Sequence, residues 1–118
     1  MIDLNNKHFR ATANSGAGEV DTRTRFTYYQ DGEVVWGTYA GGSIRFGTLT
    51  GVMEDSGQLR FAYQHVNDNL RIMTGFCRST PEILADGRIR MHETWEWTSG
   101  GEDAGQSVIE EIPQNTTS

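Results

Sequence analysis

Tight-turn signals recur along this chain about every ten residues, which leaves little room for helices. The clearest are Asp31-Gly32, Gly41-Gly42, Asp55-Ser56-Gly57, Asn67-Asp68-Asn69 and Asp86-Gly87. An Asp-Gly pair between β-rich runs favours a type I′ hairpin turn, because both central residues of that turn need a positive φ. No window of about a dozen residues keeps a 3.6-residue apolar period without meeting a turn signal. The sequence therefore predicts an all-β chain.

The runs between these turns have strand character, and we expect about eight to ten short strands. The main runs are residues 7–14, 23–30, 33–40, 43–54, 58–66, 70–80, 88–98 and 106–112. Thr80-Pro81-Glu82 permits at most one helical turn, and we expect Pro81 to end regular ladder pairing. A meander of this many strands is better closed than left with exposed edges. We predict an antiparallel up-and-down β-barrel, with a two-sheet sandwich as the alternative.

Length and charge limit the classes of protein to consider. The 118 residues suit a single domain, expected over residues 1–112, with 113–118 as a flexible C-terminal tail. The net charge of −6 and the dispersed Lys and Arg residues argue against nucleic-acid binding. No run is apolar enough for a membrane-spanning helix or a secretory signal, so no membrane partner is expected. The single cysteine, Cys77, favours a reducing compartment, and we expect a cytoplasmic protein.

The run 88–98 carries the most informative pattern in the sequence. In a strand its odd positions share one face, which brings together Ile89, Met91, Glu93, Trp95 and Trp97. Glu93 is thus a carboxylate on an apolar wall. Such a group needs a hydrogen-bond partner, a cation or a raised pKa.

A second run adds to this wall, since Phe61, Tyr63 and His65 share a face of 58–66. Small β-barrels can hold one small ligand in the lumen. We expect a small organic ligand there, with Glu93 as polar anchor. The expected ligand-binding set is Glu93, Trp95, Trp97, Tyr63, His65, Arg78 and Tyr28. The sequence does not decide which face of 33–40 and of 43–54 points inward, because both faces of each run carry apolar residues.

Three other interpretations compete with this one. In the first, the aromatic rings fill the core and Glu93 pairs with an arginine such as Arg78. In the second, the protein is an enzyme with Glu93 as general acid or base, assisted by His65 or Arg78. In the third, the outer face of the barrel or an edge strand mediates homodimerisation. Catalytic residues are not assigned.

The sequence indicates neither a cofactor nor a metal site. Gly16-Ala17-Gly18 has no third glycine or following helix, so it is not a phosphate-binding loop. The three histidines, His8, His65 and His92, lie in separate runs. His92-Glu93 begins like a helical zinc-protease motif, but position 96 is Glu and the run is a strand.

Several motifs resemble a group of small bacterial proteins labelled N-acetylglutamate synthase. They are Met73-Thr74-Gly75, Ser79–Leu84, Asp86–Arg90, His92-Glu93 and Trp95–Gly100, within a resemblance from about Asn6 to Ile112. The label implies an acetyltransferase fold that binds acetyl-CoA through an Arg/Gln-x-x-Gly-x-Gly/Ala turn. The nearest string, Ala13–Gly18, has alanine in the Arg/Gln position and no helix after it. That string therefore departs from the acetyl-CoA-binding pattern that the label implies. By architecture the chain is more similar to avidin and lipocalin barrels, which is a likeness of fold.

Overall fold

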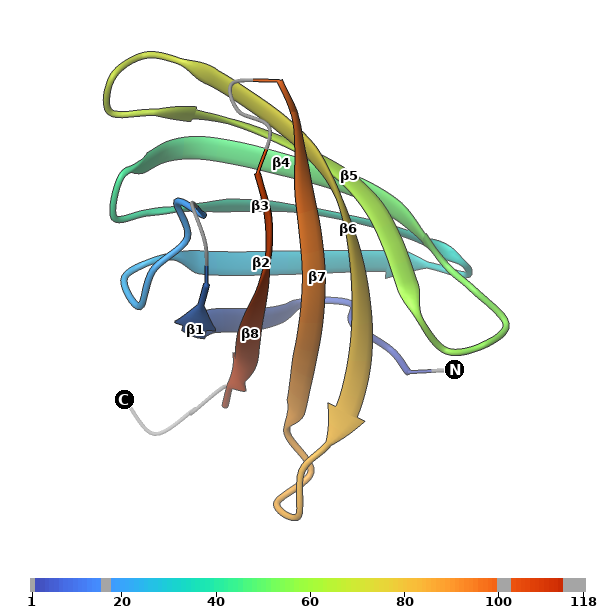
Figure 1. The fold of residues 1–118 in the computed structure, drawn as a ribbon. Helices are drawn as coiled ribbons and strands as arrows, with labels where there is room; N and C mark the ends of the chain where they lie inside the picture. The colour runs from blue at the N-terminus through green and yellow to red at the C-terminus, as the bar shows by residue number, and fades with distance from the viewer. Residues whose placement is uncertain (1, 16–17, 100–102, 114–118) are drawn as a thin grey trace.

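The computed structural model describes residues 2–15, 18–99 and 103–113, and these form a closed antiparallel barrel of eight strands (Figure 1). The strands are β1 (Lys7–Asn14), β2 (Arg25–Asp31), β3 (Val34–Gly41), β4 (Ile44–Met53), β5 (Leu59–Asn67), β6 (Ile72–Ile83), β7 (Ile89–Ser99) and β8 (Ala104–Ile112). Each strand pairs with the next along the chain, and β1 pairs with β8 to close the sheet. The predicted up-and-down barrel is confirmed, and the sandwich alternative is wrong.

Turn chemistry accounts for the short connections. Gly32, Gly41, Gly42, Gly57 and Gly87 all have positive φ, the backbone region that glycine occupies at low cost. Among the described residues there is no helix, and hence none long and apolar enough to cross a membrane. The expected flexible tail lies at 113–118, of which residues 114–118 are outside the described part of the chain.

The prediction that Pro81 ends ladder pairing is wrong, because β6 continues through it to Ile83. Pro81 pairs with Met91 on β7. On its other side β5 has already ended, since the last pairing of β5 with β6 joins Leu59 to Ser79. Pro81 therefore lies at a sheet edge, where a residue without a backbone N–H is tolerated. The β6–β7 hairpin projects beyond the barrel at this point (Figure 1).

The inward faces of β3 and β4, which the sequence left open, are settled by burial. On β3, Val35 and Tyr39 point inward, and Trp36 is exposed. On β4 the register shifts between Ile44 and Phe46, so both Ile44 and Leu49 are buried although their positions differ in parity. A bulge of this kind moves the following side chains to the opposite face.

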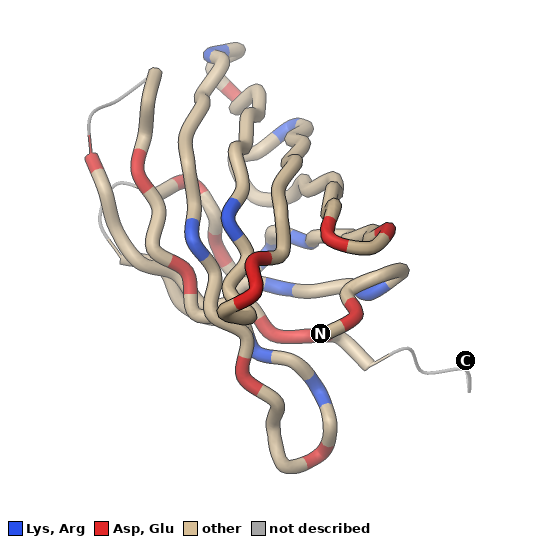
Figure 2. The backbone as a smooth tube through the Cα atoms, turned by 90° about the vertical axis from the view of Figure 1, so that its right-hand side faces the viewer, with Lys and Arg blue, Asp and Glu red and all other residues tan. Residues whose placement is uncertain are grey.

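One end of the lumen is packed with apolar side chains. The largest fully buried ones are Tyr28, Phe9, Leu4, Leu59, Met91, Ile109 and Val35. Acidic and basic residues are interspersed along the strands and their connections (Figure 2). Pairs such as Arg90–Glu110, which joins β7 to β8 at 3.1 Å, are partly exposed and each contribute roughly 0–1 kcal/mol.

Inward aromatic residues lie directly across from glycines on neighbouring strands. The pairs are Tyr28–Gly37, Tyr39–Gly47, Phe61–Gly51, Tyr63–Gly75 and Trp95–Gly105. A Cβ added at Gly47 would overlap the ring of Tyr39, and one at Gly75 would overlap the Tyr63 hydroxyl and the Glu96 carbonyl oxygen. Gly47 and Gly75 therefore make the space that the side chains of Tyr39 and Tyr63 occupy.

We expect Gly75→Ala to lower the free energy of unfolding by about 1–3 kcal/mol, as overpacking of a buried site does. The obstacle includes the Glu96 carbonyl oxygen, and backbone cannot move aside as a side-chain tip can. Urea denaturation measures the change. The control is Thr94→Ala on the exposed face of β7, which should stay within about 0.5 kcal/mol of wild type. Equal stability of the two variants would contradict this account of the glycine.

Candidate functional site

A cavity of about 50 Å³ lies in the lumen at the end away from the packed core. Its walls come from most strands of the barrel and from the segment between β1 and β2. The lining residues are Asn14, Gly18, Glu19, Val20, Phe26, Tyr39, Leu49, Phe61, Tyr63, His65, Cys77, Glu93, Trp95, Trp97 and Ser107. None of the largest fully buried side chains is among them. The barrel therefore has a filled end and a hollow end.

Glu93 lies at the boundary between the two ends. Along the inward face of β7 the side chains run from Met91, which is completely buried, through Glu93 to Trp95 at the cavity. In the sheet, Glu93 pairs with Ser79 on β6 and with Ser107 on β8. Each serine hydroxyl donates to one carboxylate oxygen, at 2.8 Å from Ser79 and 3.0 Å from Ser107.

Burial raises the pKa of Glu93 to about 7, from an ordinary value of 4.5. The two serine hydroxyls act in the opposite direction by stabilising the carboxylate, but desolvation is the larger effect. Glu93 also helps to raise the pKa of Tyr28 and of Cys77, although burial of these two groups is the main cause. Glu93 can therefore exchange a proton near neutral pH, whereas its phenol and thiol neighbours stay protonated.

Aromatic rings form the wall beside Glu93. The ring centroids of Trp95 and Trp97 are 5.6 Å apart, and Trp97 lies 5.7 Å from both Tyr63 and His65 in edge-to-face contacts. Such contacts fix ring orientation and contribute roughly 0.5–1.5 kcal/mol per pair beyond the burial of area. The cavity wall is thus aromatic and held in place by its own packing.

Residues 18–20, here called the mouth segment, line the cavity between β1 and β2. Glu19 accepts a hydrogen bond from the Asn67 amide at 3.0 Å and is 2.7 Å from Nε2 of His65. His65 Nδ1 in turn is 2.9 Å from the Tyr39 hydroxyl. With the proton on Nε2, His65 donates to Glu19 and accepts from Tyr39. The carboxylate of Glu19 therefore holds the mouth segment to β5.

A second contact holds the same segment on the opposite wall. Asn14 donates to the Val20 carbonyl oxygen at 2.8 Å and accepts from the Trp95 indole N–H at 3.2 Å. A Cβ at Gly18 would overlap both Asn14 and Trp95, so glycine permits the close approach. Within the described residues, no three His, Cys, Asp or Glu side chains come together to hold a metal ion.

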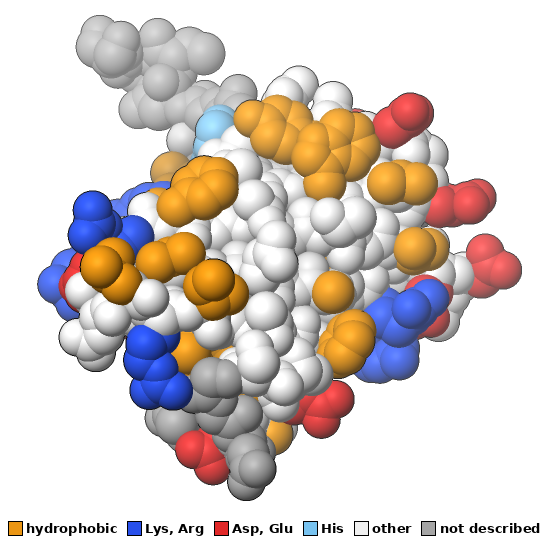
Figure 3. Space-filling view, turned by 90° about the horizontal axis from the view of Figure 1, so that it is seen from above, with side chains coloured by type: hydrophobic (Ala, Val, Ile, Leu, Met, Phe, Trp, Pro, Cys, Tyr) orange, Lys and Arg blue, Asp and Glu red, His pale blue; other side chains and the backbone are white. Residues whose placement is uncertain are grey.

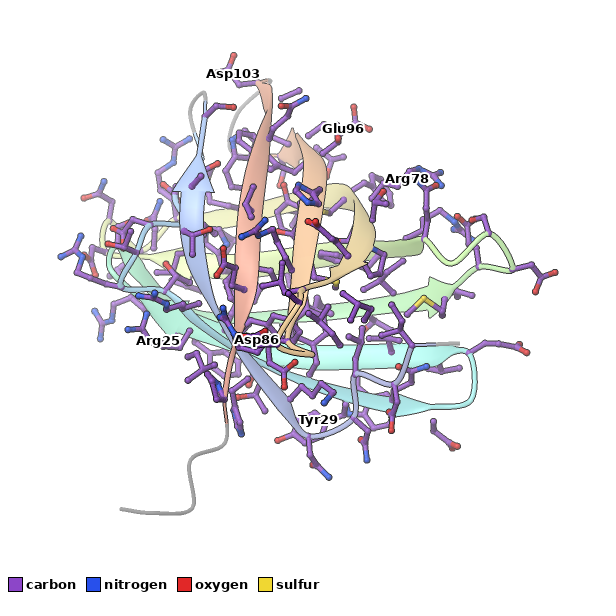
Figure 4. All side chains as sticks on the ribbon, turned by 90° about the horizontal axis from the view of Figure 1, so that it is seen from below. Arg25, Tyr29, Arg78, Asp86, Glu96 and Asp103 are labelled. Carbon is purple, nitrogen blue, oxygen red and sulfur yellow. The ribbon has the colours of Figure 1, made fainter. Side chains whose placement is uncertain are left out.

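The structure brings five of the seven predicted site residues to the cavity: Glu93, Trp95, Trp97, Tyr63 and His65. Tyr28 is inside the barrel but in the packed end, and its hydroxyl makes no hydrogen bond within the described residues. Arg78 is on the outer surface (Figure 4), where its guanidinium bonds Glu54 at 2.8 Å. The expectation that Arg78 points inward and pairs with Glu93 is therefore wrong, because it has the opposite parity to Cys77 on β6.

Sequence reasoning missed several lining residues and both hydrogen-bond partners of Glu93. Ser79 and Ser107 become partners of Glu93 only through strand register, which the sequence does not state. Tyr39 depends on the inward face of β3. Glu19 comes from a connection between strands and carries no periodic signal. Cys77 and Ser79 share a face of their strand, and that alternation was the available signal for both.

Comparison with known families agrees with this architecture. The model of the avidin-like protein family matches residues 2–112. The chain belongs to the avidin-like family. The matched range covers all eight strands of the avidin-like barrel. No curated protein and no solved structure was found to match the chain significantly.

Replacing Glu93 by Gln should remove a pH dependence from the stability of this avidin-like barrel. The folded state keeps a proton on Glu93 up to about pH 7 and the unfolded state only to about 4.5, so the free energy of unfolding falls as pH rises between these values. The total loss is about 3 kcal/mol. Urea denaturation from about pH 4 to about pH 8 should show this loss in wild type and not in Glu93→Gln.

The matched control is Glu96→Gln, an exposed carboxylate on the same strand. Its stability profile should run parallel to that of wild type. A Glu93→Gln profile that also runs parallel to wild type would show that Glu93 is not held protonated in the folded barrel.

Proposed function

We propose that this barrel binds a small organic molecule in its lumen, with Glu93 as the polar anchor and Trp95 and Trp97 as the wall. The observation that carries the proposal is the cavity itself, which is lined by the buried carboxylate of Glu93 and by the aromatic residues Trp95 and Trp97. Ligand sites are typically concave and apolar, with a few convergent polar groups. Membership of the avidin-like family agrees with ligand binding in general.

The size of the cavity limits the ligand. About 50 Å³ is well below the roughly 150 Å³ of an engineered cavity that takes up benzene. A ligand of a few heavy atoms fits with the mouth segment in place. A larger ligand requires Glu19 to leave His65 and Asn67 so that the segment can open.

Acid–base catalysis by Glu93 is the second candidate. It is favoured by the pKa of about 7 and by the position of the carboxyl at a cavity. Binding is preferred because Glu93 needs only its hydrogen-bonding capacity for that role. Each carboxylate oxygen accepts one serine bond and keeps room for a further donor.

Fragment binding should shift the indole N–H signals of Trp95 and Trp97 in ¹⁵N–¹H NMR spectra and leave that of the exposed Trp36 in place. Cys77→Leu places a larger side chain in the cavity, and we expect it to abolish the shifts. Phe76→Leu is the matched control on the outer face of β6 and should bind like wild type.

Binding that survives Cys77→Leu would place the ligand outside the lumen and contradict the proposal. Should Cys77→Leu fail to fold, Cys77→Val offers a smaller increase in volume, and a partial loss of affinity is then expected.

We also propose that the outer face forms a homodimer. Trp36, Thr50, Ala62 and Phe76 lie in one row across β3 to β6, with no charged side chain between them. Thr50, Ala62 and Phe76 of this row line a groove of about 840 Å³ together with Val34 and Val52, and the charged Arg60, Arg78 and Glu96 also line it. Figure 3 shows hydrophobic side chains in groups, with charged ones towards the edges of that view. Apolar patches of this kind mark association surfaces.

A two-fold interface uses the same patch on both copies, and an uncharged row meets itself without repulsion. Ala62→Arg puts a charge on the groove floor and should convert a dimer into a monomer. Light scattering after size-exclusion chromatography measures the mass. Ala85→Arg, the same exchange in the exposed β6–β7 turn, should leave the dimer intact. A monomeric wild type would contradict this proposal.

A further inference from the structure

The charges inside the barrel are of one sign, and this bears on which ligand the proposed lumen site takes. Among the residues that the structure describes, two carboxylates line the cavity, Glu19 and Glu93, and His65 is the only basic side chain on its wall. None of the ten lysine and arginine residues is buried. Glu19 already has His65 and Asn67 as partners. Glu93 has only neutral hydroxyls, so it is the one buried carboxylate in the described residues without a cationic partner.

An anionic ligand finds no unpaired basic partner among the described lining residues, because His65 already contacts Glu19. A buried anion needs a cation or several donors, and the lining offers a second negative group instead. A neutral ligand would leave the carboxylate of Glu93 uncompensated. A cation would offset the desolvation penalty of this carboxylate by a direct charge interaction.

The aromatic wall also favours a positively charged ligand. The faces of aromatic rings carry negative electrostatic potential and attract cations within about 6 Å of the ring centre. Trp95, Trp97 and Tyr63 surround the cavity beside Glu93. Desolvated cation–π contacts are worth about 2 kcal/mol. The wall therefore suits a cation with a flat apolar body.

The hydrogen-bonding geometry of Glu93 narrows the class further. One serine bonds each carboxylate oxygen, so both oxygens keep acceptor capacity. A ligand with two parallel N–H groups, such as an amidinium, can bond both oxygens at once. The cavity of about 50 Å³ limits such a ligand to a few heavy atoms while the mouth is closed.

We propose that the lumen binds a small, flat organic cation of the amidinium type, whose N–H groups bond the Glu93 carboxylate and whose body lies against Trp95 and Trp97. This inference rests on the proposed lumen-binding function and adds the chemical class of the ligand. Neither the packed end of the barrel nor the outer groove combines an aromatic wall with a buried carboxylate.

The charge state of the site sets the pH dependence of binding. The titratable groups that interact with Glu93 are Tyr28, Tyr39, Tyr63 and Cys77, and burial raises the pKa of each, so all stay neutral at physiological pH. His65 and Glu19 face the same cavity from the mouth. A cation binds the carboxylate form of Glu93, so its affinity should fall as pH drops below about 7.

The test compares acetamidinium, acetamide and acetate, which share one shape and differ in charge. Each is titrated into ¹⁵N-labelled protein and followed on the indole signals of Trp95 and Trp97. At about pH 8 we expect acetamidinium to bind at least about tenfold more tightly than acetamide, and acetate to bind most weakly. Glu93→Gln should reduce the affinity for acetamidinium to that for acetamide, and the exposed Glu96→Gln control should match wild type.

A second measurement needs no variant. In wild type the affinity for acetamidinium should fall by up to about tenfold per pH unit below the pKa of Glu93, and that for acetamide should change little. Any pH dependence of the affinity that comes from His65 would remain in Glu93→Gln. This variant therefore separates the contribution of His65 from that of Glu93.

Two failures are distinguishable. If acetamide or acetate binds as tightly as acetamidinium, or if Glu93→Gln binds acetamidinium like wild type, the cation inference is overturned and lumen binding stands. If no compound of any charge gives indole shifts that Cys77→Leu removes, the lumen-binding function itself is overturned.

Discussion

The close packing of inward aromatic rings against glycines on neighbouring strands is the constraint on which this structure depends. An eight-stranded barrel has an interior just wide enough for side chains to fill. Tyr39 and Tyr63 lie inside it because Gly47 and Gly75 opposite them have no Cβ. A Cβ at either position would overlap the tyrosine side chain opposite, which would have to shift. The glycines thus leave room for these rings on the wall of the barrel.

This arrangement explains why Glu93, Ser79 and Ser107 lie together at the boundary between the packed end and the hollow end of the barrel. The packed end excludes water around Leu59 and Met91, and the hollow end begins where Glu93 meets Ser79 and Ser107 in register. The carboxylate is close enough to the core to lose its hydration. It also lies at the cavity, where a new partner can reach it. The raised pKa follows from this position between the two ends.

The sequence was informative wherever period-two alternation ran without interruption. It placed Glu93, Trp95 and Trp97 on one inward face, because β7 has no bulge within that stretch. It failed for Arg78, whose neighbour Cys77 occupies the inward position on β6. Strand register and non-periodic connections are set by tertiary pairing, and so Ser107 and Glu19 had no signal of their own.

The bulge in β4 and the continuation of β6 through Pro81 also depend on strand pairing, which the sequence alone does not determine. A one-residue shift reverses every later side chain, so both faces of 43–54 looked equally suitable. The missing N–H of Pro81 predicts a break in the ladder. That lack matters only where strands lie on both sides of the proline, and here one side is free of β5. Whether β5 extends that far depends on the length of its own turn, which propensity does not determine.

Glu93 also links stability to function. Holding a carboxyl in the lumen costs the folded state about 3 kcal/mol at high pH, a large share of the typical 5–15 kcal/mol of a folded domain. A glutamine would make similar hydrogen bonds without that cost. Residues that break a local rule of folding occur mainly at functional sites. The cost is reduced when a cation enters beside the carboxylate, so the same group that weakens the empty barrel would strengthen the occupied one. A destabilised carboxylate, an aromatic wall and the absence of buried basic residues other than His65 among those described all favour one occupant, a small positively charged ligand.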